Sequence, residues 1–298
     1  MRWLVTGAGG MLGTDLVAYL RAGGEPVTAL GRAELDIRRP RAVAAALDRD
    51  RPDVLVNCAA WTRVDDAEAH EAEALAVNGD AVAVLAAACA ERGVRLVQLS
   101  TDYVFDGTAR APYPEDAPAS PLGAYGRGKL AGERAALAHG HLVVRTAWLY
   151  GAHGRNFVRT MLDLAAGHGT VAVVADQVGQ PTWSADLAAQ IVALARAGAP
   201  SGVYHGTNAG QTTWYGFARE IFAAAGADPA RVTPATTAEL ARPAPRPAYS
   251  VLGHAGWARA GLPPMRHWRD AFRAAWPLLI GGAGRANGVP SGARGGAQ

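Results

Sequence analysis

Tyr125 and Lys129 are the two residues whose types and spacing most clearly suit catalysis. Lys129 is the only lysine among the 298 residues; the other side chains with a permanent positive charge are arginines. Residues four apart on an α-helix share a face, so the phenol and the ammonium group would project together. A nearby cation favours the phenolate, which would lower the tyrosine pKa from about 10 and make the phenol a usable proton donor near neutral pH. A surface Tyr and Lys on an ordinary helix would have the same spacing, so this prediction needs support from the rest of the chain.

Glycines near the N-terminus are spaced at intervals of three residues, between a predicted strand at 3–5 and a helical pattern that continues through Leu20. This arrangement is typical of dinucleotide-binding loops. Glycines let the backbone turn tightly and approach a pyrophosphate, and the helix N-terminus offers free N–H groups and a favourable dipole. A generic glycine-rich turn is the alternative. The predicted cofactor-binding residues of this loop are Gly7, Gly10, Met11, Leu12 and Gly13.

Arg32 follows the second predicted strand, at 27–30, where an NAD-specific protein often carries an acid for the ribose hydroxyls. An arginine there could pair with a 2′-phosphate, which would favour NADPH while NADH is still accepted. A solvated arginine is the alternative. Asp36 and Ile37 come shortly afterwards and are predicted to edge the adenine pocket.

Small and polar residues follow two further predicted strands. Cys58, Ala59 and Ala60 follow the strand at 53–56, and Thr101 and Asp102 follow the strand at 95–99. Ligands of open parallel sheets bind outside the carboxyl ends of the strands, where small residues leave room. A hydroxyl at this edge can hydrogen-bond a substrate oxygen, although Ser, Thr and Asp also form turns without any catalytic role.

The elements that must position these residues alternate regularly. Strand patterns at 3–5, 27–30, 53–56, 95–99 and 141–145 are separated by helical patterns, which predicts an α/β protein with a Rossmann-type doubly wound parallel sheet. Residues 1–150 are predicted to form the dinucleotide-binding domain. Residues 151–280 are predicted to form mainly a smaller substrate-binding lobe, interleaved with the sheet. The Gly-, Ala- and Ser-rich residues 281–298 are predicted to be a disordered tail.

Composition excludes several classes of protein. The net charge is +3, the pI is about 9.1 and there is no basic run, which argues against nucleic-acid binding. Cys58 and Cys89 have neither metal-site spacing nor the pattern of a disulfide framework. We identify no signal peptide and expect no apolar run long enough to span a membrane, so a cytoplasmic protein is predicted.

Together these features resemble the extended short-chain dehydrogenase/reductase family and, within it, the dTDP-4-dehydrorhamnose reductases. The resemblance covers roughly residues 2–277. It rests on the glycine loop, on Thr101, on Tyr125 with Lys129, and on longer motifs at 100–107, 121–133, 145–151, 176–182 and 246–252. Two departures are visible: Gly128 stands where relatives usually carry Ser or Thr, and Gly253-His254 replaces a common Leu-Asp.

The resemblance implies hydride transfer from NADPH to the C4 carbonyl of dTDP-4-dehydro-L-rhamnose, which yields dTDP-L-rhamnose. Tyr125 would then donate the proton, Lys129 would lower its pKa and hold the nicotinamide ribose, and Thr101 would orient the reacting oxygen. Asp102 and Trp148 would contact the sugar, with the indole offering a face to its ring. The resemblance places Arg246 and Ser250 near the nucleotide diphosphate.

Two other functions stay open at this point. One is a nucleotide-sugar epimerase of the same fold that recycles a tightly bound NAD. The other is a catalytically silent NADP-binding regulatory subunit, although such a protein has no need of Thr101, Tyr125 and Lys129. A homodimer is one option for the assembly, and Mg²⁺ is a further cofactor to consider, without assigned ligands.

Overall fold

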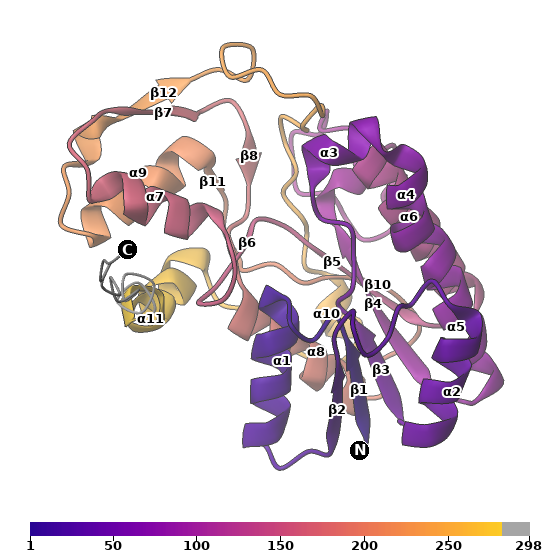
Figure 1. Cartoon of the computed structure of the whole chain (residues 1–298). Helices are drawn as coiled ribbons and strands as arrows, with labels where there is room; N and C mark the ends of the chain where they lie inside the picture. Colours follow the sequence, from indigo (N-terminus) through magenta and orange to yellow (C-terminus); the bar gives the residue numbers. More distant parts are fainter. Residues whose placement is uncertain (282–298) are drawn as a thin grey trace, which may run out of the picture.

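A six-stranded parallel sheet forms the centre of the protein in the computed structural model, which describes residues 1–281 (Figure 1). Its strands run in the order β2-β1-β3-β4-β5-β10, and every neighbouring pair is parallel. The strands are β1 (Trp3–Thr6), β2 (Val27–Leu30), β3 (Val54–Asn57), β4 (Arg95–Thr101), β5 (Leu142–Thr146) and β10 (Gly202–His205). From β1 the chain adds β2 on one side of the sheet and then β3 on the other. The crossing helices therefore lie on opposite faces, which creates a crevice at the carboxyl ends of β1 and β3. The predicted fold class is confirmed.

Helices cover both faces of this sheet (Figure 1). On one face, α1 (Met11–Ala22) packs against α8 (Ser184–Arg196), and their apolar residues share a core with β1 and β4. On the other face, α2 (Pro40–Asp50), α5 (Ala81–Glu91) and α6 (Ala124–Ala138) enclose a second core. Burial on both faces explains why the strands read as nearly continuous apolar runs.

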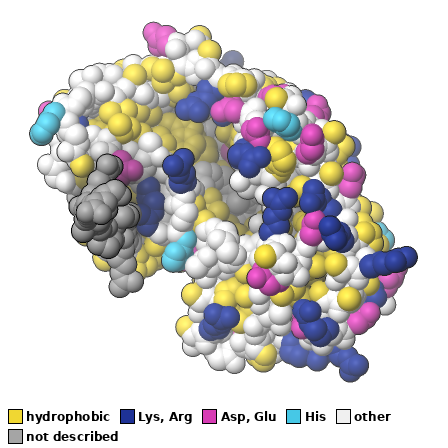
Figure 2. Space-filling model, viewed as in Figure 1, with side chains coloured by type: hydrophobic (Ala, Val, Ile, Leu, Met, Phe, Trp, Pro, Cys, Tyr) yellow, Lys and Arg dark blue, Asp and Glu magenta, His cyan; other side chains and the backbone are white. Residues whose placement is uncertain are grey.

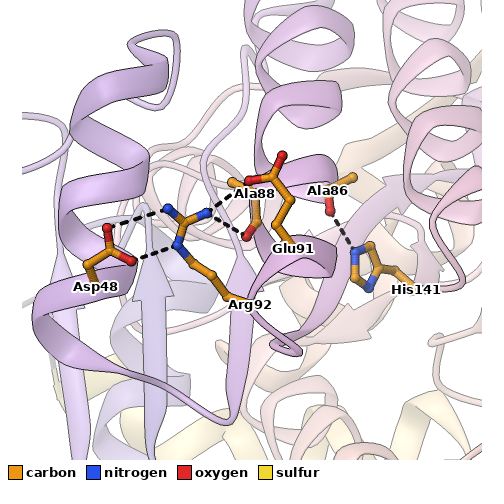
Figure 3. A network of polar contacts seen from close by, with 6 residues as sticks. All are labelled: Asp48, Ala86, Ala88, Glu91, Arg92 and His141. Atoms are coloured by element: carbon orange, nitrogen blue, oxygen red, sulfur yellow. Dashed lines mark hydrogen bonds and ion pairs between the residues drawn. The ribbon is translucent and has the colours of Figure 1, made fainter.

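Polar contacts tie the second face together (Figure 3). Arg92, just after α5, donates from Nε to Oδ1 of Asp48 on α2 over 2.8 Å and from Nη1 to the carbonyl of Ala88 over 3.1 Å. The ring of His141, just before β5, lies with Nε2 2.9 Å from the carbonyl oxygen of Ala86. These contacts fix α5 against α2 and against the start of β5.

The helical stretch Glu71–Glu91 is interrupted by a wider turn. It consists of α4 (Glu71–Leu75), the π-helical η1 (Ala76–Asp80) and α5, and it follows a short unpredicted helix, α3 (Val64–Ala69). The continuous stretch Glu71–Glu91 is long and apolar enough to cross a membrane, so the expectation that no run reaches that length was wrong. Its packing against α2, α6 and the sheet accounts for this composition, which core helices of globular proteins share.

A smaller lobe follows β5 and has its own core, in which Phe217 and Trp268 are fully buried. Its helices are α7 (Phe157–Ala165), α9 (Trp214–Ala224) and α11 (Trp268–Gly281), and its paired strands are β6 (Leu149–Tyr150) with β9 (Thr182–Trp183), β8 (Val178–Gly179) with β11 (Thr212–Thr213), and β7 (Val171–Val174) with β12 (Val232–Ala235). Short turns at η2 (Asp102–Val104), η3 (Pro229–Arg231) and α10 (Gly256–Arg259) complete the chain.

The chain returns from this lobe to the sheet through α8 and β10, so the two parts are interleaved. A domain boundary near residue 150 therefore stays a prediction. Thr213 caps α9, because its side chain accepts a hydrogen bond from the backbone N–H of Gly216. The last helix runs on to Gly281, the first residue of the predicted disordered tail, and residues 282–298 of that tail lie outside the described residues.

Candidate active site

A cavity of about 1000 Å³ opens at the carboxyl ends of β1, β3 and β4, and it extends to the smaller lobe. Figure 2 shows this side of the molecule hollowed between its two parts. Sixteen of the predicted site residues line the cavity, whereas Arg246 and Ser250 do not. Those sixteen are Gly7, Gly10, Met11, Leu12, Gly13, Arg32, Asp36, Ile37, Cys58, Ala59, Ala60, Thr101, Asp102, Tyr125, Lys129 and Trp148.

The glycine loop forms a cradle that has no room for side chains. Gly7 has a left-handed backbone with φ of 63°, and a Cβ atom there would lie 2.6 Å from the backbone nitrogen of Ala59. A Cβ atom at Gly13 would lie 2.4 Å from the carbonyl oxygen of Gly7. Gly10 caps α1 without a side-chain hydrogen bond, so the first N–H groups of the helix stay available to an anion. The cradle therefore fits a dinucleotide pyrophosphate.

The far end of the cavity carries two arginines. Arg32 lines it as predicted, and Arg38, which the sequence analysis missed, lines it as well. Arg38 donates from Nε and Nη2 to the two carboxylate oxygens of Asp36 over 2.9 and 2.7 Å, and this pairing lowers the pKa of Asp36 to about 2. The acid nearest the strand end, Glu34, accepts a 2.9 Å hydrogen bond from the backbone N–H of Gly31.

The first turns of α6 place Tyr125 and Lys129 in the cavity wall, but the two groups are not coupled as predicted. Burial raises the pKa of Tyr125 to about 12, and the nearby Asp102 carboxyl group acts in the same direction. The prediction that Lys129 lowers this pKa was wrong for the geometry observed. Lys129 is itself buried, which lowers its pKa to about 8, and its Nζ donates a 2.5 Å hydrogen bond to the carbonyl of Leu99 on β4.

Thr101 ends β4 and caps the turn η2, which begins at Asp102. The Thr101 hydroxyl accepts a 3.2 Å hydrogen bond from the backbone N–H of Tyr103 and donates one of 3.0 Å to Oδ1 of Asp102. Asp102 is 2 % exposed, and burial raises its pKa to about 6. Its Oδ2 atom is buried and makes no hydrogen bond to any residue within 1–281. Buried polar atoms normally have partners, so this oxygen points to a ligand that donates a hydrogen bond.

Arg246 and Ser250 are the two predicted site residues that do not line the cavity. Arg246 donates a 2.7 Å hydrogen bond from Nη1 to Oδ1 of Asp65 on α3 and another of 2.6 Å to the carbonyl of Ala244. Ser250 is 2 % exposed and lies close enough to Asp102 to lower the pKa of its carboxyl group, but its hydroxyl is outside hydrogen-bonding geometry with Oδ2. Their predicted role at a diphosphate stays a proposal.

The cavity wall includes further residues that the sequence analysis did not place there: Trp61, Arg63, Arg155 and Trp214. The side-chain amide of Asn78 positions Trp61. Its Oδ1 accepts a 2.9 Å hydrogen bond from the backbone N–H of Trp61, and its Nδ2 donates one of 3.0 Å to the carbonyl of Trp61. Asn78 lies on the π-helical turn, and such turns frequently occur at functional sites. The sequence carries no local signal for this widened turn.

The described side chains suit one of the two expected cofactors, the dinucleotide, and not the metal ion. Residues 1–281 contain no group of three or more His, Cys, Asp or Glu side chains suited to hold a metal, so Mg²⁺ receives no site. The glycine cradle, by contrast, fits a dinucleotide. Arg32 follows the second strand and lines the same cavity, which is where the 2′-phosphate of NADPH would lie.

The class of protein follows from this arrangement: it is an α/β oxidoreductase of the extended short-chain dehydrogenase/reductase kind. The chain belongs to the family described as the RmlD substrate binding domain, which it matches over residues 1–277. It is 58 % identical over 281 residues to a dTDP-4-keto-6-deoxy-D-glucose reductase of Streptomyces niveus, across 93 % of this chain and 97 % of that protein. It is 55 % identical over 291 residues to a dTDP-4-dehydrorhamnose reductase of Streptomyces griseus, across 95 % and 96 % of the two chains.

Solved structures agree with this family. The dTDP-4-dehydrorhamnose reductase from Bacillus anthracis in complex with NADP matches with a TM-score of 0.89 at 35 % identity, across 93 % of this chain and 98 % of that one. A dTDP-4-dehydrorhamnose reductase from Clostridium acetobutylicum matches with a TM-score of 0.90 at 40 % identity, across 94 % and 100 %. The resemblance predicted from the sequence is confirmed, and NADPH is the cofactor that it implies.

Proposed function

We propose that this protein reduces the C4 carbonyl of dTDP-4-dehydro-L-rhamnose with NADPH and so forms dTDP-L-rhamnose. The observation that carries the proposal is the position of Thr101, Tyr125 and Lys129 in one cavity with the glycine cradle. The names of relatives that cover nearly the whole chain support the substrate class.

Each of these side chains has a separate task in the proposed reaction. The raised pKa of Tyr125 keeps its phenol protonated at neutral pH, which is the form that a proton donor to a developing C4 alkoxide requires. Thr101 can hydrogen-bond the same oxygen and orient it. Lys129 would bind the nicotinamide ribose. When bound, NADPH supplies the hydride, and the protein supplies geometry and electrostatics.

The unpartnered oxygen of Asp102 supports a sugar with a free hydroxyl beside the reacting carbon. A hexose hydroxyl that donates to Oδ2 would satisfy a buried acceptor that otherwise lacks a partner within residues 1–281. A substrate without that hydroxyl would leave the acceptor unsatisfied, and such sites reject the deoxy analogue strongly.

A second substrate is favoured by one comparison. The relative with 58 % identity is named for dTDP-4-keto-6-deoxy-D-glucose, which differs from dTDP-4-dehydro-L-rhamnose in ring stereochemistry and not in the reacting group. The same cavity residues would reduce either 4-keto sugar. The choice therefore depends on how the hexose is held and not on the catalytic side chains.

Parallel assays with the two sugars separate these possibilities. The purified protein is incubated with NADPH and either dTDP-4-dehydro-L-rhamnose or dTDP-4-keto-6-deoxy-D-glucose, while loss of absorbance and the identity of the product are followed. We expect the higher kcat/KM with the first sugar. Efficient reduction of the second sugar alone would overturn the substrate assignment. If neither sugar is reduced, the proposed reductase activity is overturned.

The same experiment addresses the alternatives from the sequence. An epimerase would convert a nucleotide sugar without net NADPH consumption, and a silent regulatory subunit would bind NADPH without turnover. We also infer a cytoplasmic location, because NADPH and nucleotide sugars are available there. A homodimer stays a prediction, for which light scattering coupled to size-exclusion chromatography is the direct measurement.

A further inference from the structure

Trp148 has an unusual backbone conformation for a large side chain. Its φ angle is 46°, in the left-handed region, which only Arg51 shares among the non-glycine residues of 1–281. Such a conformation is strained for a residue other than glycine and persists only where the surroundings enforce it. Residues in such positions cluster at functional sites, and Trp148 lines the cavity.

One face of the Trp148 ring is covered by Trp214. The two ring centroids are 3.6 Å apart and the planes differ by 11°, so the indoles are stacked with almost full overlap. Trp214 is the first residue of α9, which Thr213 caps, and Phe157 packs on Trp214 with a centroid distance of 4.6 Å. The stacking partner is therefore itself held in place.

The opposite face is covered by the backbone of Gly179. A Cβ atom on Gly179 would lie 2.5, 2.6 and 2.8 Å from Cε2, Cζ2 and Nε1 of Trp148. Because Cζ2 and Nε1 are both bonded to Cε2, nearly equal distances to all three place this point above the plane of the ring and not at its edge. Trp214 occupies the other side, since its ring and this backbone cannot share one face.

Trp148 thus lies in a sandwich between two walls, the backbone of Gly179 and the ring of Trp214. Both walls are tied to one small sheet. Gly179 on β8 pairs with Thr212 on β11 in antiparallel register, and Trp214 follows two residues later. The spacing between the walls is thus fixed by a strand pairing and a capped helix. The expected contact, in which the indole offers a face to the sugar ring, is not available in this arrangement.

We propose that Trp214 and Gly179 are positioning residues that hold Trp148 between them, so that the hexose of the nucleotide sugar meets the edge of Trp148 and not its face. The inference rests on the proposed function, because it concerns how that sugar is held. It assigns specificity to the shape of the sandwich, since a fixed edge discriminates ring substituents more sharply than a flat face, along which a ring can slide.

The first test compares Trp214→Ala, Trp214→Phe and a control, Tyr215→Ala, by calorimetric titration of the NADP⁺-loaded protein with dTDP-L-rhamnose and with dTDP. Tyr215 neighbours Trp214 on α9 and packs on the core of the same lobe, but it does not line the cavity. We expect Trp214→Ala to raise the Kd for dTDP-L-rhamnose about tenfold and the Kd for dTDP less than twofold. Trp214→Phe, which keeps a flat partner, should restore most of the affinity.

Two further variants test the other wall and the edge. Gly179→Ala should displace Trp148 and reproduce the selective loss for dTDP-L-rhamnose, with NADPH affinity unchanged. Trp148→Phe keeps a stackable face but shortens the edge and removes the ring N–H, so it should also lose sugar affinity. Wild-type sugar affinity in Trp214→Ala or in Trp148→Phe, or an equal loss in Tyr215→Ala, would overturn the proposal. Catalytic failure of the wild type would overturn the proposed function. The titrations with dTDP-L-rhamnose and dTDP would still show whether Trp214 and Gly179 hold Trp148 in the position that binds the sugar.

Discussion

The hydroxyl of Thr101 donates a 3.0 Å hydrogen bond to Oδ1 of Asp102, while Oδ2 of the same carboxyl group is buried without a partner among residues 1–281. A half-satisfied buried carboxyl group is costly for the fold. Its presence in the cavity wall beside Tyr125 is understandable if a ligand supplies the missing donor. In the proposed function, this pair joins the hydroxyl that orients the reacting oxygen to the carboxyl group that recognises the substrate.

Asp102→Asn should stabilise the protein while it weakens substrate binding. The folded pKa of Asp102, about 6, lies above its ordinary value of 3.8. Its burial therefore favours the fold below about pH 3.8, and this contribution is lost as the pH rises through about 6. The neutral amide should raise the free energy of unfolding at pH 7.5 by up to about 3 kcal/mol, and by much less at pH 4. Urea titrations at both pH values provide the measurement, and equal effects at both would contradict the assignment.

Tyr125→Phe should remove the proton donor and leave the fold nearly unchanged. A general acid typically contributes about 10²–10⁴-fold to the rate, so kcat should fall by that range. NADPH affinity, measured by fluorescence titration, should stay within a few-fold of the wild type. Activity close to the wild-type value would exclude Tyr125 as the donor.

Most of the site residues predicted from the sequence line the cavity, but the long-range packing around them could not be predicted. The glycine loop and Tyr125 could be predicted because a strand, a turn and a helix encode their positions locally. The i,i+4 spacing placed Lys129 on the correct face, but it could not reveal that Nζ reaches the carbonyl of Leu99, thirty residues earlier. The aromatic cover of Trp148 depends likewise on Gly179 and Trp214, which only the pairing of β8 with β11 brings together.

Arg32→Ala should reduce the preference for NADPH over NADH. A charge-assisted hydrogen bond to a 2′-phosphate is worth about 1.5–3 kcal/mol, so the ratio of kcat/KM for the two cofactors should fall by roughly tenfold or more. Arg38→Ala is the matched comparison, because Arg38 lines the same end of the cavity but is paired with Asp36. A wild type that prefers NADH, or an unchanged ratio in Arg32→Ala, would rule out the role of Arg32.

Gly128→Ala should stabilise α6 without a change in activity. A Cβ atom there would meet its nearest neighbour, Cβ of Asn78, at 3.4 Å, which is ordinary van der Waals contact. Replacing a glycine inside a helix by alanine is worth roughly 0.5–1 kcal/mol. Gly126→Ala serves as the contrast, because its Cβ atom would lie 2.2 Å from the carbonyl oxygen of Tyr103. Thermal denaturation should move the two variants in opposite directions.

Asp65→Asn and Arg246→Ala together test whether Arg246 binds the substrate diphosphate. Arg246 is paired with Asp65 over 2.7 Å, and a diphosphate would have to replace that carboxylate as its partner. If it does, Arg246→Ala should raise the Kd for dTDP by about tenfold, as expected from the loss of one charge-assisted contact, and Asp65→Asn should leave the Kd unchanged or lower it. NADPH affinity should be unaffected in both variants. If the pair only fastens residues 242–246 to α3, both variants should instead lose stability to a similar degree while the Kd for dTDP stays at the wild-type value.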